Sequence, residues 1–172
     1  MKGVRGLNAF LLYRLRLDHL AVAHVVVLPQ LTDVADLTPA AIAALRQWVR
    51  RGGKLILTHD AVGFRWHMPL FPEVGRGVGR GTAREIVTTA SIGRRQAGWA
   101  FEHSYADHVR LAVGQRGKVL AAEATPDGAP VLVAGQVGKG VVILSGILPA
   151  YTKEPLCDAE KELFVGLIVS SH

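Results

Sequence analysis

The sequence predicts one α/β domain whose sheet is mostly parallel and ends in a C-terminal antiparallel β-meander. The first supporting observation is an apolar run, a helical stripe and a second apolar run, which follow one another over residues 24–58. The second is a series of short apolar runs separated by turn residues over residues 109–144. The third is the length of 172 residues. One domain of this length can bury about two-thirds of its unfolded surface.

Residues 24–58 form the clearest unit of the prediction. After its first residue the run at 24–28 is continuously apolar, as in strands that are buried on both faces. Thr38 and Pro39 are an N-cap and a first-turn residue of a helix. That helix carries an apolar stripe and ends at a Gly-Gly pair, after which residues 54–58 form the next strand. A strand, a helix and a strand in this order predict parallel pairing through a right-handed crossover.

The last third of the chain predicts antiparallel strands and a closing helix. The strands are separated by turns that contain glycine. We place them at residues 109–113, 118–122, 130–134 and 141–144. Apolar patterns predict helices over residues 158–169 and, before the first strand, over residues 7–23. The Gly-rich middle, residues 60–107, is predicted to be irregular.

Two segments of the chain resemble class I glutamine amidotransferase-like proteins. They are residues 24–63, HVVVLPQLTDVADLTPAAIAALRQWVRRGGKLILTHDAVG, and residues 117–149, GKVLAAEATPDGAPVLVAGQVGKGVVILSGILP. These segments look most like the non-amidotransferase branch, namely the ThuA-like proteins and the amidotransferase-like domain of some bacterial β-galactosidases. The resemblance covers a little under half of the chain. It implies a three-layer flavodoxin-like sandwich, with residues 1–172 as one amidotransferase-like domain that lacks the usual first strand.

The resemblance allows the family's chemistry to be checked position by position. A working glutaminase has a cysteine directly after the strand that here ends at Thr58, where this chain has His59 and Asp60. The family's catalytic histidine follows the late strand that here ends at Leu144, where this chain continues with Ser-Gly-Ile. Without a thiolate and a histidine to activate it, no acyl-enzyme forms. The sequence therefore predicts that the chain is not a functional glutamine amidotransferase.

His59 and Asp60 are the predicted catalytic residues. They lie at the carboxyl end of a predicted parallel strand, where α/β folds place their ligands. A histidine there can act as a base or as a metal ligand. The resemblance supports this interpretation, because ThuA-like proteins often carry a histidine in a similar place. The alternative is a polar turn in which Asp60 caps a following helix.

The middle of the chain supplies further candidates for ligand binding. They are Trp66, His67, Arg76, Arg80, His103 and Tyr105. Aromatic rings beside polar groups suit stacking on a sugar, and alternating Arg and Gly residues suit an anion held by backbone N–H groups. The alternatives are core aromatics, exposed loop histidines and a flexible loop over residues 75–81. Convergence of the histidines with Asp60 would make a mixed metal site. Nothing in their spacing demands one, so neither a metal nor a cofactor is expected.

The charge and its distribution along the chain indicate which kinds of binding partner to expect. The net charge is +6 and the isoelectric point is near 9.9, which brings nucleic acid into consideration. The arginines are scattered and no RNA- or DNA-binding motif is present, so nucleic-acid binding is not expected. No apolar run reaches the ~18–20 residues that span a membrane. A cytoplasmic location is the default prediction.

Three functional hypotheses follow, in order. The first is a catalytically inactive amidotransferase-like domain that acts in ligand binding or assembly. An uncovered sheet edge would favour a homo-oligomer. The second is a ThuA-like carbohydrate-related enzyme or sugar-binding protein that uses His59 and Asp60 on a small sugar-like ligand. The third, anion or nucleic-acid binding through the Arg/Gly segment, ranks last.

Overall fold

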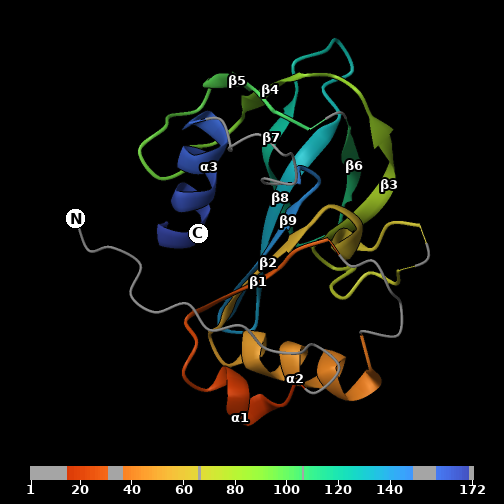
Figure 1. Ribbon diagram of the computed structural model, residues 1–172, viewed down its shortest axis with the longest axis vertical. Helices are drawn as coiled ribbons and strands as arrows, with labels where there is room; N and C mark the ends of the chain where they lie inside the picture. The colour runs from red at the N-terminus through yellow and green to blue at the C-terminus, as the bar shows by residue number, and fades with distance from the viewer. Residues whose placement is uncertain (1–14, 31–36, 66, 106, 149–157, 171–172) are drawn as a thin grey trace.

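The computed structural model describes residues 15–30, 37–65, 67–105, 107–148 and 158–170. The helices are α1 (Leu17–Leu20), α2 (Pro39–Arg50), the 3-10 helix η3 (His59–Val62) and α3 (Asp158–Val169). The strands are β1 (Val25–Leu28), β2 (Lys54–Thr58), β3 (Gly75–Gly81), β4 (Glu85–Thr88), β5 (Ala100–Glu102), β6 (His108–Val113), β7 (Gly117–Glu123), β8 (Pro130–Val137) and β9 (Gly140–Ser145). Seven strands form a mixed sheet in the order β1-β2-β9-β8-β7-β4-β5, and β3 and β6 form a separate two-stranded ribbon (Figure 1).

The predicted three-layer flavodoxin-like sandwich is wrong. The pairs β1–β2 and β2–β9 are parallel, whereas β9–β8, β8–β7, β7–β4 and β4–β5 are antiparallel. The sheet curls into a half-barrel. In the described part of the chain only α2 and α3 are longer than one turn, which is too little helix for two outer layers. The prediction expected a mostly parallel sheet with an antiparallel meander at its C-terminal end, whereas β4 and β5 of the middle segment extend the antiparallel side, so that antiparallel pairs outnumber parallel ones.

The strand–helix–strand unit itself is confirmed. The Thr38 hydroxyl accepts a hydrogen bond from the Ala41 N–H at 3.2 Å, and Pro39 begins α2. Strands β1 and β2 pair in parallel, with Val26 opposite Leu55. On its other side β2 pairs in parallel with β9. The carboxyl ends of these three strands therefore meet at one edge of the sheet.

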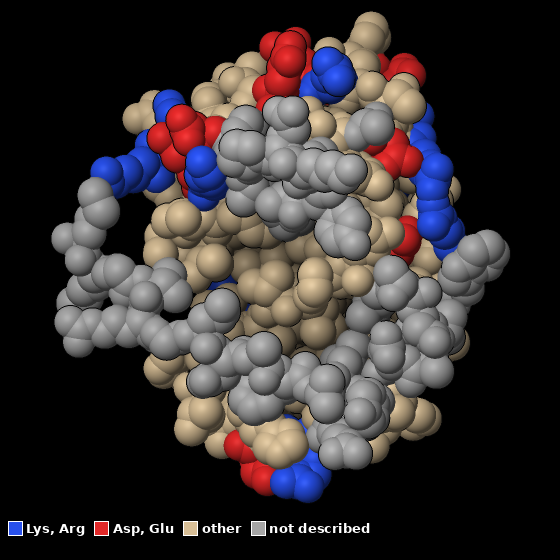
Figure 2. Space-filling model, in the orientation of Figure 1, with Lys and Arg blue, Asp and Glu red and all other residues tan. Residues whose placement is uncertain are grey.

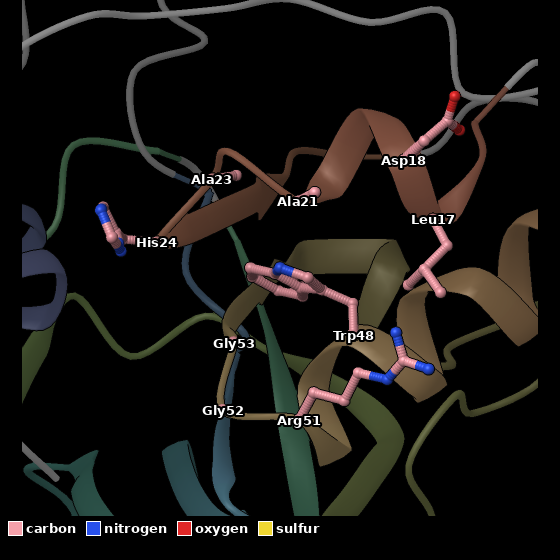
Figure 3. A pocket seen from close by; sticks show the side chains of 9 residues that line it. All are labelled: Leu17, Asp18, Ala21, Ala23, His24, Trp48, Arg51, Gly52 and Gly53. Carbon is pink, nitrogen blue, oxygen red and sulfur yellow. The ribbon is translucent and has the colours of Figure 1, made fainter.

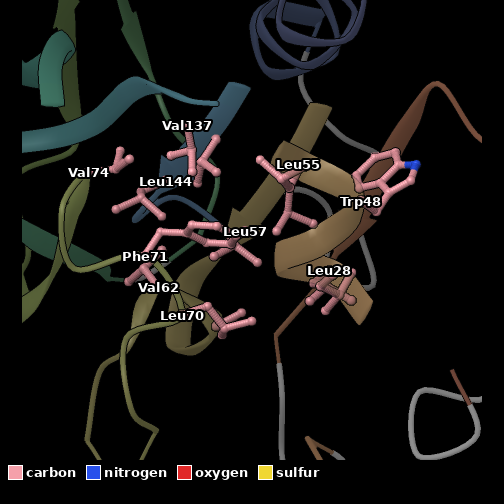
Figure 4. Close-up of a cluster of buried hydrophobic side chains, with 14 of the residues drawn as sticks. Leu28, Trp48, Leu55, Leu57, Val62, Leu70, Phe71, Val74, Val137 and Leu144 are labelled. Carbon is pink, nitrogen blue, oxygen red and sulfur yellow. The ribbon is translucent and has the colours of Figure 1, made fainter. Parts of the chain in front are cut away.

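Apolar side chains pack on both faces of the sheet. Leu55 and Leu57 of β2 are fully buried on the face that also receives α2 and the ribbon (Figure 4). Ile56 points to the other face and packs in the cluster that contains Leu163 and Leu167 of α3. Full burial of each such side chain is worth about 1.5–3 kcal/mol. The alternation makes β2 a central strand, and it gives the residues that follow the strand a rigid support.

The Gly-rich segment over residues 75–81 is not the flexible loop that the sequence favoured. It is strand β3, and it pairs with β6 in antiparallel register with a bulge between Gly77 and Gly79. An added Cβ would lie 2.6 Å from the Ala112 carbonyl oxygen at Gly75 and 2.7 Å from the Phe64 Cβ at Gly77. These glycines are needed for close packing, which is a common reason for glycine inside a strand.

The ends of the chain are only partly described. The predicted closing helix is confirmed as α3. Of the helix predicted over residues 7–23, the structure describes α1, while residues 1–14 lie outside the described part. The prediction of a missing first strand therefore stays untested. No helix in the described ranges has the length and apolarity that crossing a membrane requires.

Candidate functional site

The turn after β2 has an unusual backbone. His59 directly follows the strand and begins η3 with a φ of 48°. Left-handed backbone at a residue other than glycine costs on the order of 1–3 kcal/mol and is concentrated at functional sites. The turn ends at Gly63, with a φ of 83°, where an added Cβ would lie 2.5 Å from the Pro69 Cα. The fold thus holds His59 in a strained position at the carboxyl end of a central strand.

His59 lies between two carboxylates. Its Nδ1 is 3.5 Å from the Asp60 Oδ1, and its Nε2 is 3.6 Å from the Asp107 Oδ1. The His59 side chain is only 2% exposed. Both ring nitrogens and the Asp60 Oδ1 are buried without a hydrogen-bond partner among the described residues. Buried polar atoms without a hydrogen-bond partner cost about 1–3 kcal/mol each, so they call for an explanation.

Each carboxylate directs its second oxygen to a donor or a cation. The Asp60 Oδ2 accepts a hydrogen bond from the Gln30 Nε2 at 3.0 Å and lies 3.5 Å from the Arg65 Nη1. The Asp107 Oδ2 lies 3.3 Å from the Arg80 Nη1. Two guanidinium groups balance two carboxylates, which offsets part of the desolvation cost. The Arg65 and Arg80 side chains are 29% and 52% exposed, so they form the outer rim of the cluster.

An aromatic ring completes the strand-end cluster, which we define as Gln30, His59, Asp60, Arg65, Arg80, Tyr105 and Asp107. The Tyr105 ring centroid is 6.0 Å from that of His59, and the two rings meet edge to face at 85°. Tyr105 is partly exposed. The cluster therefore combines a histidine, two acids, two cations and an aromatic ring.

The structure brings together four of the predicted site residues, His59, Asp60, Arg80 and Tyr105. The alternative interpretation, in which Asp60 caps a following helix, is wrong, because Asp60 lies inside η3 and its carboxylate faces Gln30 and Arg65. Gln30 could have been found from the sequence, since it follows β1 and neighbouring parallel strands end at one edge. Asp107 could not, because it approaches His59 only once the ribbon is folded.

The other predicted ligand-binding residues lie elsewhere. Arg76 is exposed on β3 opposite Ala112, at the other end of that strand from Arg80. His67 is buried, and its N–H donates to the Phe64 carbonyl. Trp66 lies outside the described residues.

His103 belongs to a second group, the buried histidine network, which consists of His103, His108, Arg110 and Glu123. The His108 Nε2 is 2.7 Å from the Glu123 Oε1, and Arg110 donates to both oxygens of Glu123 at 2.7 and 2.9 Å. Burial lowers the pKa of His108 and outweighs the opposing hydrogen bond to Glu123. Burial raises the pKa of Glu123, but the hydrogen bonds from Arg110 and His108 outweigh it, and the net shift is downward.

No metal site was found in the described ranges, in the sense of three or more His, Cys, Asp or Glu side chains arranged around one point. The unpartnered atoms of the strand-end cluster come from one histidine and one aspartate. A metal ion needs several ligating side chains around one point, whereas a polar ligand can form single hydrogen bonds with the unpartnered atoms of His59 and Asp60. These atoms therefore suit a polar ligand better than an ion.

A cavity of about 570 Å³ lies at the opposite end of the parallel strands (Figure 3). It is lined by α1, the end of α2 and the residues before β1, with the Trp48 indole in its wall and Arg51 beside it. The Asp18 carboxylate there already accepts from Arg16 at 3.1 Å. The cavity gathers few polar side chains, so the chemistry of the strand-end cluster makes it the stronger candidate.

Positive and negative side chains are mixed on the face of the molecule in Figure 2. On the face in Figure 2, groups of Lys and Arg lie around the rim with Asp or Glu close by, and the visible tan surface of the middle is mostly uncharged. On this face the acidic side chains interrupt the basic ones, whereas a nucleic-acid-binding surface carries a basic patch or stripe.

Comparisons with known proteins identify the fold alone. No family model and no curated protein matches the sequence. The N-terminal domain of mmIFT52 matches with a TM-score of 0.68 and 12% identity over 91% of this chain and 82% of that chain. Cytoplasmic protein STM3548 from Salmonella typhimurium matches with a TM-score of 0.61 and 13% identity over 88% and 73%. A β-galactosidase from Bacillus circulans sp. alkalophilus matches with a TM-score of 0.57 and 15% identity over 84% and 21%.

These matches correct two expectations. The chain spans about a fifth of the β-galactosidase that it matches. None of the three proteins is named as an amidotransferase-like or flavodoxin-like protein, and the mixed half-barrel is a different architecture. The descriptions flavodoxin-like and glutamine amidotransferase-like are therefore not supported. The resemblance of the two segments to the class I family stays a prediction from the sequence.

Proposed function

We propose that this chain is a non-catalytic ligand-binding module that holds a small, sugar-like ligand at the carboxyl end of β2. The observation that carries the proposal is the set of buried polar atoms that have no hydrogen-bond partner among the described residues, namely both ring nitrogens of His59 and the Asp60 Oδ1. Such atoms in an otherwise paired cluster indicate a place where hydrogen bonds are completed by a ligand.

The chemistry of the rim suits a polyhydroxylated molecule. Arg65 and Arg80 offer donors, Asp107 offers acceptors, and Tyr105 offers an apolar ring. Sugars need donors and acceptors together with an apolar surface for their C–H faces. A strongly anionic ligand fits less well, because both arginines already face carboxylates.

We expect no glutaminase chemistry, on a steric basis as well as a sequence basis. An added Cβ at Gly146, directly after β9, would lie 1.8 Å from the Val109 carbonyl oxygen. No side chain fits there, and the preceding Ser145 hydroxyl donates to the Ile147 carbonyl. No histidine can therefore occupy Gly146, and the turn after β2 has no thiol. The same fold forms part of longer β-galactosidase chains, which is consistent with a module that serves a larger protein.

The test is binding of a panel of neutral monosaccharides, measured by saturation-transfer NMR and calorimetry. We expect at least one sugar to bind the wild-type chain and Arg80→Ala to weaken that binding by about tenfold, the equivalent of ~1.4 kcal/mol. Arg76→Ala is the matched control, because it removes an exposed arginine from the same strand outside the cluster. Absence of binding to every sugar at millimolar concentration would refute the proposal.

A carbohydrate-related enzyme that uses His59 is the second candidate. It is favoured by the left-handed backbone of His59 and by the carboxylate on either side of its ring. A sugar that binds and is converted by the wild-type chain, but not by His59→Gln, would replace the first proposal with this one. Self-association and a cytoplasmic location also stay proposals, and light scattering after size exclusion tests the former.

A further inference from the structure

The β3–β6 ribbon connects the strand-end cluster to the buried histidine network. Arg80 and Asp107 form an ion pair at 3.3 Å in the cluster. Their neighbours in sequence, Gly81 and His108, are opposite each other in the ribbon. Successive residues of a strand point to opposite sides, so the two groups flank the ribbon on different sides. The geometry of the ion pair therefore depends on how Gly81 and His108 are held.

Hydrogen bonds fix the ring of His108. The Glu123 carboxylate only accepts, so the His108 Nε2, 2.7 Å away, carries the proton. The His103 Nε2 is 3.0 Å from the Ala83 carbonyl, which also only accepts, so it carries a proton too. The His103 Nε2 proton is therefore shared between the Ala83 carbonyl and the His108 Nδ1, which lies 3.2 Å away and accepts. This arrangement requires one tautomer of His108.

Close packing fixes the backbone opposite that ring. His108 is fully buried and Glu123 is 1% exposed. An added Cβ at Gly81 would lie 2.1 Å from the Glu123 Oε1 and 2.3 Å from the His108 Nε2. Two residues earlier on β3, an added Cβ at Gly79 would have nothing within 4 Å. Gly81 is thus required by the network, while Gly79 is not.

We propose that Gly81, His108 and Glu123 are positioning residues for the strand-end cluster, which rests on the function proposed above. They hold the end of the ribbon so that Arg80 meets Asp107 and the Asp107 carboxylate stands beside His59. Glu123 lies on β7 of the main sheet and forms hydrogen bonds with His108 and Arg110 of β6, so it connects the main sheet to the ribbon. Arg110, which donates to both Glu123 oxygens, keeps that carboxylate oriented.

The test is a matched pair of glycine substitutions, Gly81→Ala and Gly79→Ala. The readout is the ¹H–¹⁵N resonances of the His59 ring, assigned with His59→Gln, because they report on the Asp107 carboxylate without a ligand. We expect Gly81→Ala to move these resonances in the direction produced by Asp107→Asn, and Gly79→Ala to leave them unchanged. In an Asp107→Asn background, Gly81→Ala should add no further shift, since both changes act through one carboxylate.

Glu123→Gln provides a second route that keeps the size of the side chain. We expect a smaller His59 shift in the same direction, together with a change in the tautomer signature of His108. Folded Gly81→Ala and Glu123→Gln variants with unchanged His59 resonances would overturn the inference. If Gly81→Ala does not fold, Glu123→Gln alone decides. Failure of wild-type sugar binding would refute the proposed function but would not affect this result.

Discussion

The strand-end cluster and the buried histidine network lie on two sides of one ribbon and treat buried charge differently. In the network, the Glu123 carboxylate receives hydrogen bonds from His108 and Arg110, and both its oxygens are engaged. In the cluster, His59 and one oxygen of Asp60 are buried without hydrogen bonds. The network has one unpartnered buried atom of its own, the His103 Nδ1, so the contrast lies in the carboxylates. The Glu123 carboxylate is hydrogen-bonded at both oxygens, which rigidifies this part of the fold, whereas one oxygen of Asp60 has no hydrogen-bond partner among the described residues. The comparison assigns support to one group and ligand contact to the other.

The largest expected effect breaks the supporting side of this comparison. Glu123→Ala leaves the buried His108 N–H and the Arg110 guanidinium without their carboxylate. We expect the free energy of unfolding to fall by about 3 kcal/mol, the lower end for a broken buried ion pair, because Arg110 stays partly in water. Denaturant titration measures it. Glu162→Ala, which removes an exposed partner of Arg95, is the control and should cost less than about 1 kcal/mol. Equal losses would contradict the assignment.

An intermediate effect is expected on the pH dependence of stability. The pKa of buried His108 is lowered below its ordinary value of 6.5, so the unfolded chain binds that proton more readily. The contribution of His108 to the free energy of unfolding is therefore fully present above about pH 6.5 and decreases as the pH falls below that value. The pKa of Glu123 is lowered below 4.5, so its contribution is lost only at lower pH, as that group becomes protonated.

Urea titrations between pH 7 and pH 4 test this dependence. We expect His108→Gln to flatten the decline just below pH 6.5 and to keep the decline below 4.5. The exposed His24→Gln variant is the control. An unchanged slope in His108→Gln would mean that another group causes the loss of stability.

The smallest expected effect on stability concerns the strand-end cluster. Asp60→Asn keeps the size of the side chain and an oxygen that can accept the Gln30 hydrogen bond. We therefore expect the free energy of unfolding to fall by only about 1 kcal/mol. Binding of any sugar identified by the panel should weaken more than stability does. A loss of stability as large as that of Glu123→Ala would show that the two groups are both structural, and the comparison would fail.

Local patterns explain which parts of the fold could be predicted. The start of α2 depends on Thr38 and Pro39, which act within one turn, so the sequence contains the whole signal. Strand β3 is different, because four alternating glycines carry no apolar pattern. Three of them are required by contacts with distant residues, such as those of Gly81 with Glu123. Sequence reasoning therefore predicted a loop where the structure has a strand.

The candidate site divides in the same way. The position of His59 and Asp60 after a central strand followed from the order of elements, because strand ends place their following residues at one edge. The contribution of Asp107 did not follow, since it comes from a ribbon that pairs β3 with β6 rather than β6 with β7.

The sequence by itself determined the strand–helix–strand unit, the closing helix, and the polar pair of His59 and Asp60 that follows β2. It did so because caps, periodicity and residue identity act over a few positions. Only the tertiary structure decided that the sheet is mixed and curled, and that His59 stands between two carboxylates. Strand pairing and ion pairs join residues far apart in the chain, and their free energies depend on burial that no local pattern contains.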